Sequence, residues 1–194
     1  MGWHETMELL EARLDGTLRG TYRPMDNVPF FRVQYPPAQE REALAQFQAL
    51  AERLRQRDWE VRCISLIEVL QAALEHLVNC PTSELSGQLR QLEAGRDRDE
   101  LRTQLSEHLP DEISDLLKAD LGAIPREGVA ILLRMGGLYP LVRTSAIESR
   151  LEARVSCAIV LAYPGTSVGA LLDTQPAGGH GGYYRGEILQ WHEG

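Results

Sequence analysis

Residues 128–165 read GVAILLRMGGLYPLVRTSAIESRLEARVSCAIVLAYPG, and this stretch decides the fold. Its first apolar run, residues 129–133, is too short for a helix and ends at Arg134 and two glycines. Such an unbroken run is typical of a strand that is buried on both faces. A second run, residues 155–162, ends at a Tyr-Pro-Gly sequence, where proline lacks a backbone donor and glycine permits a turn. The pattern therefore predicts two buried strands.

A helix is predicted between these two strands. Ser145 and Glu148 stand at the spacing of a capping box, in which the hydroxyl and the carboxylate bind free backbone N–H groups at a helix start. The helix is expected over about residues 146–153. Strand, helix and strand joined in this way form a right-handed crossover between parallel strands.

The rest of the chain alternates helices and strands in the same manner. Helices are expected at residues 3–18, 40–56 and 67–78, and strands at residues 28–35, 59–66 and 183–191, the last as an edge strand. This alternation predicts an α/β fold, a three-layer domain with a mostly parallel sheet of about four to five strands. We expect one domain over residues 1–194, with the strands in the order 2-1-3-4.

Residues 82–121 show no strand signal. Their helical periodicity is interrupted near Gly95 and Pro110, so two or three helices are expected as an insertion between the second and third strands. This helical insertion is too long for a plain crossover. Two interpretations stay open: a lobe that binds a partner, or extra helices that cover one face of the sheet.

The charge of the chain argues against two classes of function. The formal net charge is −8, and Lys118 is the only lysine among 20 Lys and Arg residues. Proteins that bind nucleic acid through phosphate neutralisation normally carry a basic excess, so direct nucleic-acid binding is not expected. A P-loop needs a lysine after its glycines to hold the terminal phosphates, whereas Lys118 lies in a leucine-rich helical stretch.

Metal, disulfide and membrane signals are also missing from the sequence. Cys63, Cys80 and Cys157 form no C-x-x-C pair, which argues against a disulfide framework and a zinc site, and Cys63 and Cys157 are expected to be buried in apolar runs. His180 has no second ligand at metal spacing, so neither a metal nor a cofactor is expected. No apolar run reaches the roughly 18 to 20 residues that span a bilayer, and residues 1–10 lack a signal-peptide pattern. A cytoplasmic location is therefore expected.

The two arginines beside the predicted crossover are the first candidates for a binding site. Arg134 lies just past a predicted strand, and Arg143 lies just before a predicted helix start with Thr144 and Ser145. In open α/β sheets ligands bind at the carboxyl ends of the strands, and a helix start attracts anions. These residues either hold a phosphate or carboxylate, or the arginines pair with protein carboxylates and carbonyls to fix the loop.

The same stretch resembles a known family. The string R-x-G-x-x-x-P-x-x-R-T-S at residues 134–145, followed by IVLAYPG, resembles the BrxB family of bacterial BREX phage-exclusion systems. VQYPPAQERE and YYRGEIL stand in the order of the family, so the resemblance runs from about residue 28 to residue 189. The family-motif residues, which are candidates for anion or partner contacts, are Arg134, Gly136, Pro140, Arg143, Thr144, Ser145, Tyr163, Pro164, Gly165, Tyr184 and Arg185.

The resemblance implies a component of a BREX-type antiviral defence system that contacts the PglZ-type, phosphatase-like protein of the same system. The residues add that no catalytic constellation is recognisable: Ser145 has no G-x-S-x-G elbow and no histidine nearby in sequence. We therefore expect a non-enzymatic protein that works through protein–protein contacts. The alternative is a degenerate nucleotide- or nucleic-acid-sensing domain that binds a phosphate at residues 134–145. The oligomeric state is not predicted.

Overall fold

The computed structural model describes residues 2–24, 29–95, 97–151, 155–165 and 186–193. Five parallel strands form one sheet in the order β2-β3-β4-β1-β5. They are β1 (Phe30–Tyr35), β2 (Val61–Ser65), β3 (Val129–Leu133), β4 (Ala158–Pro164) and β5 (Glu187–Gln190). The helices are α1 (Trp3–Leu18), α2 (Glu40–Arg55), α3 (Leu66–Val78), α4 (Thr82–Ala94), α5 (Arg98–Gly122) and α6 (Thr144–Leu151), with short 3-10 turns η2 (Pro37–Gln39) and η3 (Met135–Leu138).

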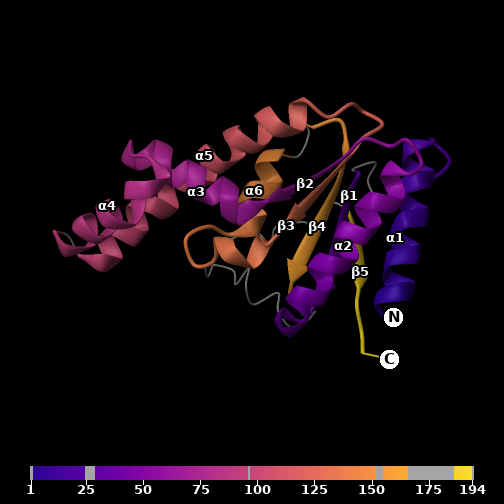
Figure 1. Ribbon diagram of the computed structural model, residues 1–194, viewed down its shortest axis with the longest axis horizontal. Coiled ribbons are helices and arrows are strands. Elements are labelled where there is room, and N and C mark those ends of the chain that lie inside the picture. Colours follow the sequence, from indigo (N-terminus) through magenta and orange to yellow (C-terminus); the bar gives the residue numbers. More distant parts are fainter. Residues whose placement is uncertain (1, 25–28, 96, 152–154, 166–185, 194) are drawn as a thin grey trace, which may run out of the picture.

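The sheet lies between two helical layers, as predicted. Figure 1 shows α1 and α2 together on one side and α3, α5 and α6 on the other. The strands alternate between the two layers: on β3, Val129 and Ile131 pack toward α1 and α2, whereas Ala130 and Leu132 pack toward the other layer. All five residues of β3 are buried, as are all seven of β4, so the unbroken apolar runs do mark strands covered on both faces.

The predicted strand order 2-1-3-4 is wrong in the position of β1. This strand lies between β4 and β5, and α2 carries the chain from β1 past β4 and β3 to β2. The burial of β1 explains its inner position. Five of its six residues are buried, and a strand is covered to this extent only when it has a neighbouring strand on each side. The second strand has Arg62 and Cys63 exposed and therefore suits the edge. The last strand, β5, is an edge strand as expected.

Gly186 permits the start of β5. Its φ is 133°, and a Cβ there would lie 2.7 Å from the carbonyl oxygen of Phe30. Only glycine adopts this backbone without strain at such close approach. The adjoining residues of the expected last strand, Tyr183, Tyr184 and Arg185, lie outside the described residues, as does His180.

The helical insertion divides into two parts. Two helices, α4 and α5, form it, within the two or three expected. Pro110 does not end a helix, because α5 continues through it, with the Ser114 hydroxyl donating a hydrogen bond to the Pro110 carbonyl. The second half of α5 covers the sheet and contributes Leu109, Ile113, Leu117 and Leu121 to the core. In α4 only Leu85 is buried, and Figure 1 shows this helix projecting away from the sheet.

Of the two cysteines expected to be buried, only one is. Cys157 precedes β4 and is fully buried, whereas Cys63 is exposed. Cys63 lies on β2, and apolar neighbours in sequence do not bury a residue whose strand stands at the edge of the sheet.

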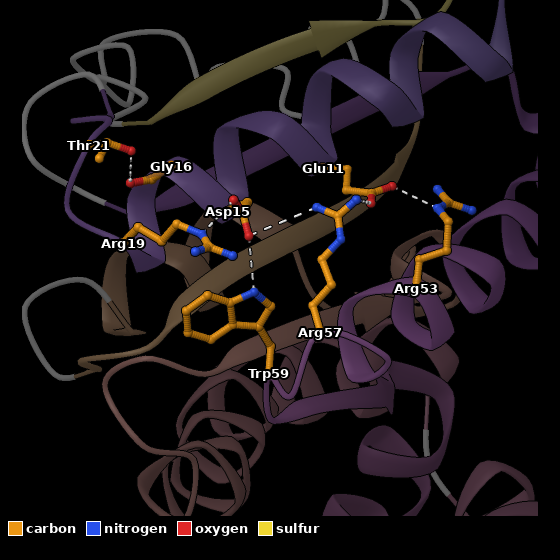
Figure 2. A network of polar contacts seen from close by, with 8 residues as sticks. All are labelled: Glu11, Asp15, Gly16, Arg19, Thr21, Arg53, Arg57 and Trp59. Atoms are coloured by element: carbon orange, nitrogen blue, oxygen red, sulfur yellow. Dashed lines mark hydrogen bonds and ion pairs between the residues drawn. The ribbon is translucent and has the colours of Figure 1, made fainter.

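A polar network joins α1 to the end of α2 (Figure 2). The buried carboxylate of Glu11 lies 2.7 Å from Arg53 Nε and 2.6 Å from Arg57 Nη2. One turn further on, Asp15 accepts hydrogen bonds from Arg19 Nε at 2.8 Å and from Trp59 Nε1 at 3.2 Å. This network fixes α1 over the chain segment that leads from α2 into β2.

Asp15 should make stability depend on pH in the acid range. The hydrogen bond from Arg19, with help from Trp59, holds the pKa of Asp15 below its usual value. A lowered pKa means that the stabilisation is complete above a pH of about 4 and is lost as the pH falls through the folded-state value. We expect Asp15→Asn to cost about 1 kcal/mol at pH 7 and less at pH 3, measured by urea unfolding at several pH values. Asp58→Asn is the control, since Asp58 contacts no cation within the described part of the chain; an equal pH profile in both variants would contradict the assignment.

Candidate functional site at the carboxyl edge of the sheet

A small pocket opens where β4 ends and the β3–α6 connection passes over it. Its lining residues are Met135, Gly136, Tyr139, Val142, Arg143, Thr144, Tyr163 and Pro164. The predicted ligand edge of the sheet and the family motif therefore meet at one place. Five of the motif residues line this pocket, and Arg134 and Pro140 lie beside it in the same connection.

The connection is shaped by its first residues after β3. Arg134 ends the strand with a φ of 60°, which turns the chain sharply into η3. Met135 and Leu138 of η3 point into the core and anchor the loop. Gly137 leaves room for a neighbour, because a Cβ at this position would lie 2.5 Å from Cγ1 of Ile67 on α3. The loop is thus held tightly against the start of α3.

Beyond η3 the chain presents an aromatic side chain to solvent. Tyr139 is 67% exposed and precedes Pro140 through a cis peptide bond. Ile67, which packs on Gly137, is itself 42% exposed. Large exposed side chains at a pocket rim are typical of a binding surface, since aromatic residues are enriched where proteins contact one another.

The two arginines of the motif are exposed and available. Within the described residues, neither the Arg134 nor the Arg143 guanidinium makes an ion pair or a side-chain hydrogen bond. The interpretation in which both arginines fix the loop by pairing with carboxylates has no counterpart in that part of the chain. Arg143 adjoins Thr144, the first residue of α6, and its backbone carbonyl accepts a hydrogen bond from Ala146 N–H at 3.1 Å. Its charge therefore lies at the N-terminal end of this helix.

A buried ion pair supports the site from below. Nη2 of Arg32 on β1 lies 3.1 and 3.2 Å from the two carboxylate oxygens of Glu148 on α6. The same guanidinium stacks on the ring of Tyr163 at 4.3 Å from its centroid. Arg32 and Glu148 are 6% and 7% exposed, so a charged pair links β1 and α6 inside the core. It fixes the start of α6 relative to the pocket wall at Tyr163.

Sequence analysis does not identify the Arg32–Glu148 ion pair, and it instead predicts that Glu148 takes part in a capping box with Ser145. The available signal was Arg32 itself, a single charged residue in the strand FFRVQY. An arginine inside a buried strand needs a carboxylate, because an isolated buried charge is too costly. Nothing in the sequence identifies Glu148 as its partner, since the two residues lie on separate elements of the fold.

The remaining motif residues occupy supporting positions. Ser145 is the second residue of α6, and the backbone N–H of Gly165 donates to the Tyr35 carbonyl at 2.7 Å, which ties the end of β4 to the end of β1. Tyr184 and Arg185 lie outside the described residues. Sequence analysis does not identify Met135, Tyr139 or Val142 as lining residues. The one usable signal is an aromatic residue, Tyr139, shortly after the Gly136-Gly137 pair.

The size of the pocket limits what it can hold. Its solvent-accessible volume is about 20 Å³, close to that of one water molecule. A small anion or a single protein side chain suits this space better than a whole nucleotide. In the described residues no group of His, Cys, Asp and Glu is arranged to hold a metal ion, and no helix there is long and apolar enough to cross a bilayer.

Comparison with known proteins identifies one family. The model of the family described as BREX protein BrxB matches residues 62–188. No curated protein sequence matches the chain.

Solved structures supply only distant likenesses. A chain in the structure of Drosophila ORC bound to poly(dA/dT) DNA and Cdc6 is similar at 21% identity and a TM-score of 0.46, over 98% of this chain and 29% of that chain. A chain in the structure of Drosophila ORC bound to AT-rich DNA and Cdc6 is similar at 20% identity and a TM-score of 0.48, over 99% of this chain and 29% of that chain. This chain therefore spans less than a third of the length of these solved chains.

Proposed function

Because the chain belongs to the BrxB family of BREX phage-defence proteins, we propose that it works without catalysis, as a cytoplasmic protein that binds another component of the BREX system. The proposed partner is the PglZ-type, phosphatase-like protein, which the family resemblance implies. The binding surface we propose is the carboxyl edge of the sheet, formed by Ile67, Arg134, Gly136, Tyr139 and Arg143 (the carboxyl-edge surface).

The observation that carries this proposal is the combination of exposed aromatic and cationic side chains around a pocket. Tyr and Arg are the residues that most often dominate the free energy of protein–protein binding. Tyr139 offers a large apolar ring with a polar tip, and Arg134 and Arg143 offer charges that no carboxylate of the described residues neutralises. A partner with acidic residues around an apolar contact fits this surface.

Co-elution of the full chain with the PglZ-type protein in size-exclusion chromatography tests the proposal. We expect the double variant Tyr139→Ala, Arg143→Ala to weaken the complex at least tenfold, a loss of about 1.4 kcal/mol or more. Arg41→Ala is the matched control, because Arg41 is exposed on α2, in the layer formed by α1 and α2. Unchanged affinity in the double variant would move the interface away from the carboxyl-edge surface, and two separate elution peaks at micromolar concentrations would refute the partnership.

A second function is favoured by one observation, the unpaired Arg143 beside the start of α6. In this alternative the loop of residues 134–145 binds a phosphate of a nucleotide or nucleic acid. Thermal melting with and without phosphate, a nucleotide or an oligonucleotide distinguishes phosphate binding from protein binding alone. Anion stabilisation that is present in the native protein and lost in Arg143→Ala supports the alternative; equal melting temperatures with and without anions exclude it.

A further inference from the structure

A second surface lies along α3, beyond the carboxyl edge of the sheet. Among the described residues, four large apolar side chains are exposed. Two of them, Ile67 and Leu77, lie near the two ends of α3, and a third, Tyr139, lies in the β3–α6 connection, whose turn η3 packs on this helix. Single exposed apolar residues are common on soluble proteins, but three on two adjoining elements indicate a contact surface.

An apolar stripe joins the two exposed residues of α3. It consists of Ile67, Leu70, Leu74 and Leu77, at spacings of three, four and three residues (the α3 stripe). Leu70 and Leu74 are only partly buried against the core. The face of α3 that the core buries is the adjacent one, formed by Leu66, Val69 and Ala73. Helix α3 therefore carries more apolar surface than its own domain covers.

The α3 stripe suits a helix better than an extended segment. A spacing of three and four residues is that of the apolar seam along which two helices interlock their side chains. The residues from Ile67 to Leu77 rise about 15 Å, which equals about three turns of a partner helix. An extended segment would gain little here, because it binds by pairing with free backbone groups, and the backbone of α3 is hydrogen-bonded within the helix.

The two ends of the α3 stripe carry opposite charges. Ser65 of β2 pairs with Leu133 of β3, so the residues that follow leave the sheet side by side, and Arg134 lies beside the start of α3. There its guanidinium, which makes no ion pair in the described part of the chain, adds to the positive N-terminal end of the helix dipole. In the last turn of α3, Glu75 accepts hydrogen bonds from an amide and a hydroxyl but makes no ion pair among the described residues. The stripe therefore runs from a positive to a negative end.

We propose that the PglZ-type partner contributes an amphipathic helix that packs along the α3 stripe, antiparallel to α3. This inference rests on the proposed function and extends the carboxyl-edge surface, which shares Ile67 with the stripe. The negative C-terminal end of the partner helix, with carboxylates in its last turn, lies over Arg134, and its positive N-terminal end lies near Glu75. Apolar residues of the partner at spacings of three and four pack between those of the stripe.

A charge placed in the α3 stripe tests the docking. Leu77 is 38% exposed and lies outside the carboxyl-edge surface, so Leu77→Glu should leave the chain folded and weaken the complex with the PglZ-type protein at least tenfold. Ala72→Glu is the matched control, because it adds the same charge to the side of α3 that lines the groove beside β2. Isothermal titration calorimetry of the full chain gives both affinities, and thermal melting reports folding. Equal affinities in the two variants overturn the inference.

Failure of this inference and failure of the proposed function give different results. A native chain that does not bind the PglZ-type protein at all overturns both. A complex that is weakened by Tyr139→Ala with Arg143→Ala, but not by Leu77→Glu, overturns the α3 stripe alone. A chain that is dimeric by itself in sedimentation equilibrium, and monomeric as Leu77→Glu, assigns the stripe to a second copy and also overturns the inference.

Photo-cross-linking measures the shape of the bound partner segment without adding a charge. Benzoylphenylalanine replaces Ile67 in one protein and Leu77 in another, and each is irradiated in complex with the PglZ-type protein. The two cross-linked positions should lie about ten residues apart in one partner segment, because both helices rise about 1.5 Å per residue, with the cross-link from position 67 nearer the partner's C-terminus. A separation of about five residues indicates an extended strand. That result, the reverse order, or cross-links in unrelated segments contradict the proposal.

Discussion

Deleting residues 82–121 should leave a chain that does not fold. The deletion removes α4, but it also removes Leu109, Ile113, Leu117 and Leu121, none of which is more than 1% exposed. Truncating a single core Leu or Ile to alanine costs about 2 to 5 kcal/mol. Losing four whole side chains exceeds a total stability of about 5 to 15 kcal/mol. Near-ultraviolet circular dichroism and the absence of a cooperative urea transition would report the loss.

Replacing only α4 is the matched control. A Gly/Ser linker of equal length in place of residues 82–94 removes one buried side chain, Leu85. We expect this variant to fold, with a loss of no more than about 3 kcal/mol. It also tests the proposed docking surface, since a complex with the PglZ-type protein should persist if the partner binds the carboxyl edge and should vanish if α4 is the binding lobe. A folded protein lacking residues 82–121 would contradict the assignment of α5 to the core.

Glu148→Ala should be among the most destabilising single substitutions. It leaves the Arg32 guanidinium without the carboxylate that lies 3.1 Å away in the core. Removing one partner of a buried ion pair costs about 3 to 5 kcal/mol, because the remaining charge is poorly solvated. The free energies of unfolding of the native protein and of Glu148→Ala, both measured in urea, check this value.

A double-mutant cycle separates the charge effect from the packing effect. Glu148→Leu combined with Arg32→Leu removes both charges and keeps apolar volume, so it should be less destabilising than the sum of the single changes. The lost stacking of Arg32 on Tyr163 limits the recovery. Strict additivity of the two single substitutions would show that the pair is not energetically coupled.

The sequence predicted the elements well because their signals are local. Period-3.6 apolar stripes located α1 and α2, and short apolar runs located β3 and β4, since burial on one or two faces leaves a direct record in the residue pattern. Strand order is not recorded in this way. Which strand lies inside the sheet depends on partners distant in sequence, and the crossover through the single helix α2 wrongly favoured β1 and β2 as neighbours.

The candidate site shows the same division. The motif arginines could be located because they adjoin a strand end and a helix start, both of which are visible in the sequence. Tyr139 was not identified, because exposure of an aromatic residue depends on how the loop turns after η3. The pairing of Arg32 with Glu148 joins residues that only the assembled sheet brings together.

The position of β1 between β4 and β5 bears on how the protein is made. Phe30 of β1 pairs with Ile159 of β4. The hydrogen bonds between β1 and β4 can therefore form only after the ribosome has synthesised β4, more than 120 residues later in the sequence. During synthesis β2 meets its neighbour β3 first, while β1 and the helix α1 that covers it have no sheet to join. Contacts of such long sequence separation slow folding, since a long loop must close before they form. The nascent chain should therefore expose the apolar residues of β1 on the ribosome until β4 emerges, and ribosome-bound chains truncated before residue 158 should remain sensitive to protease.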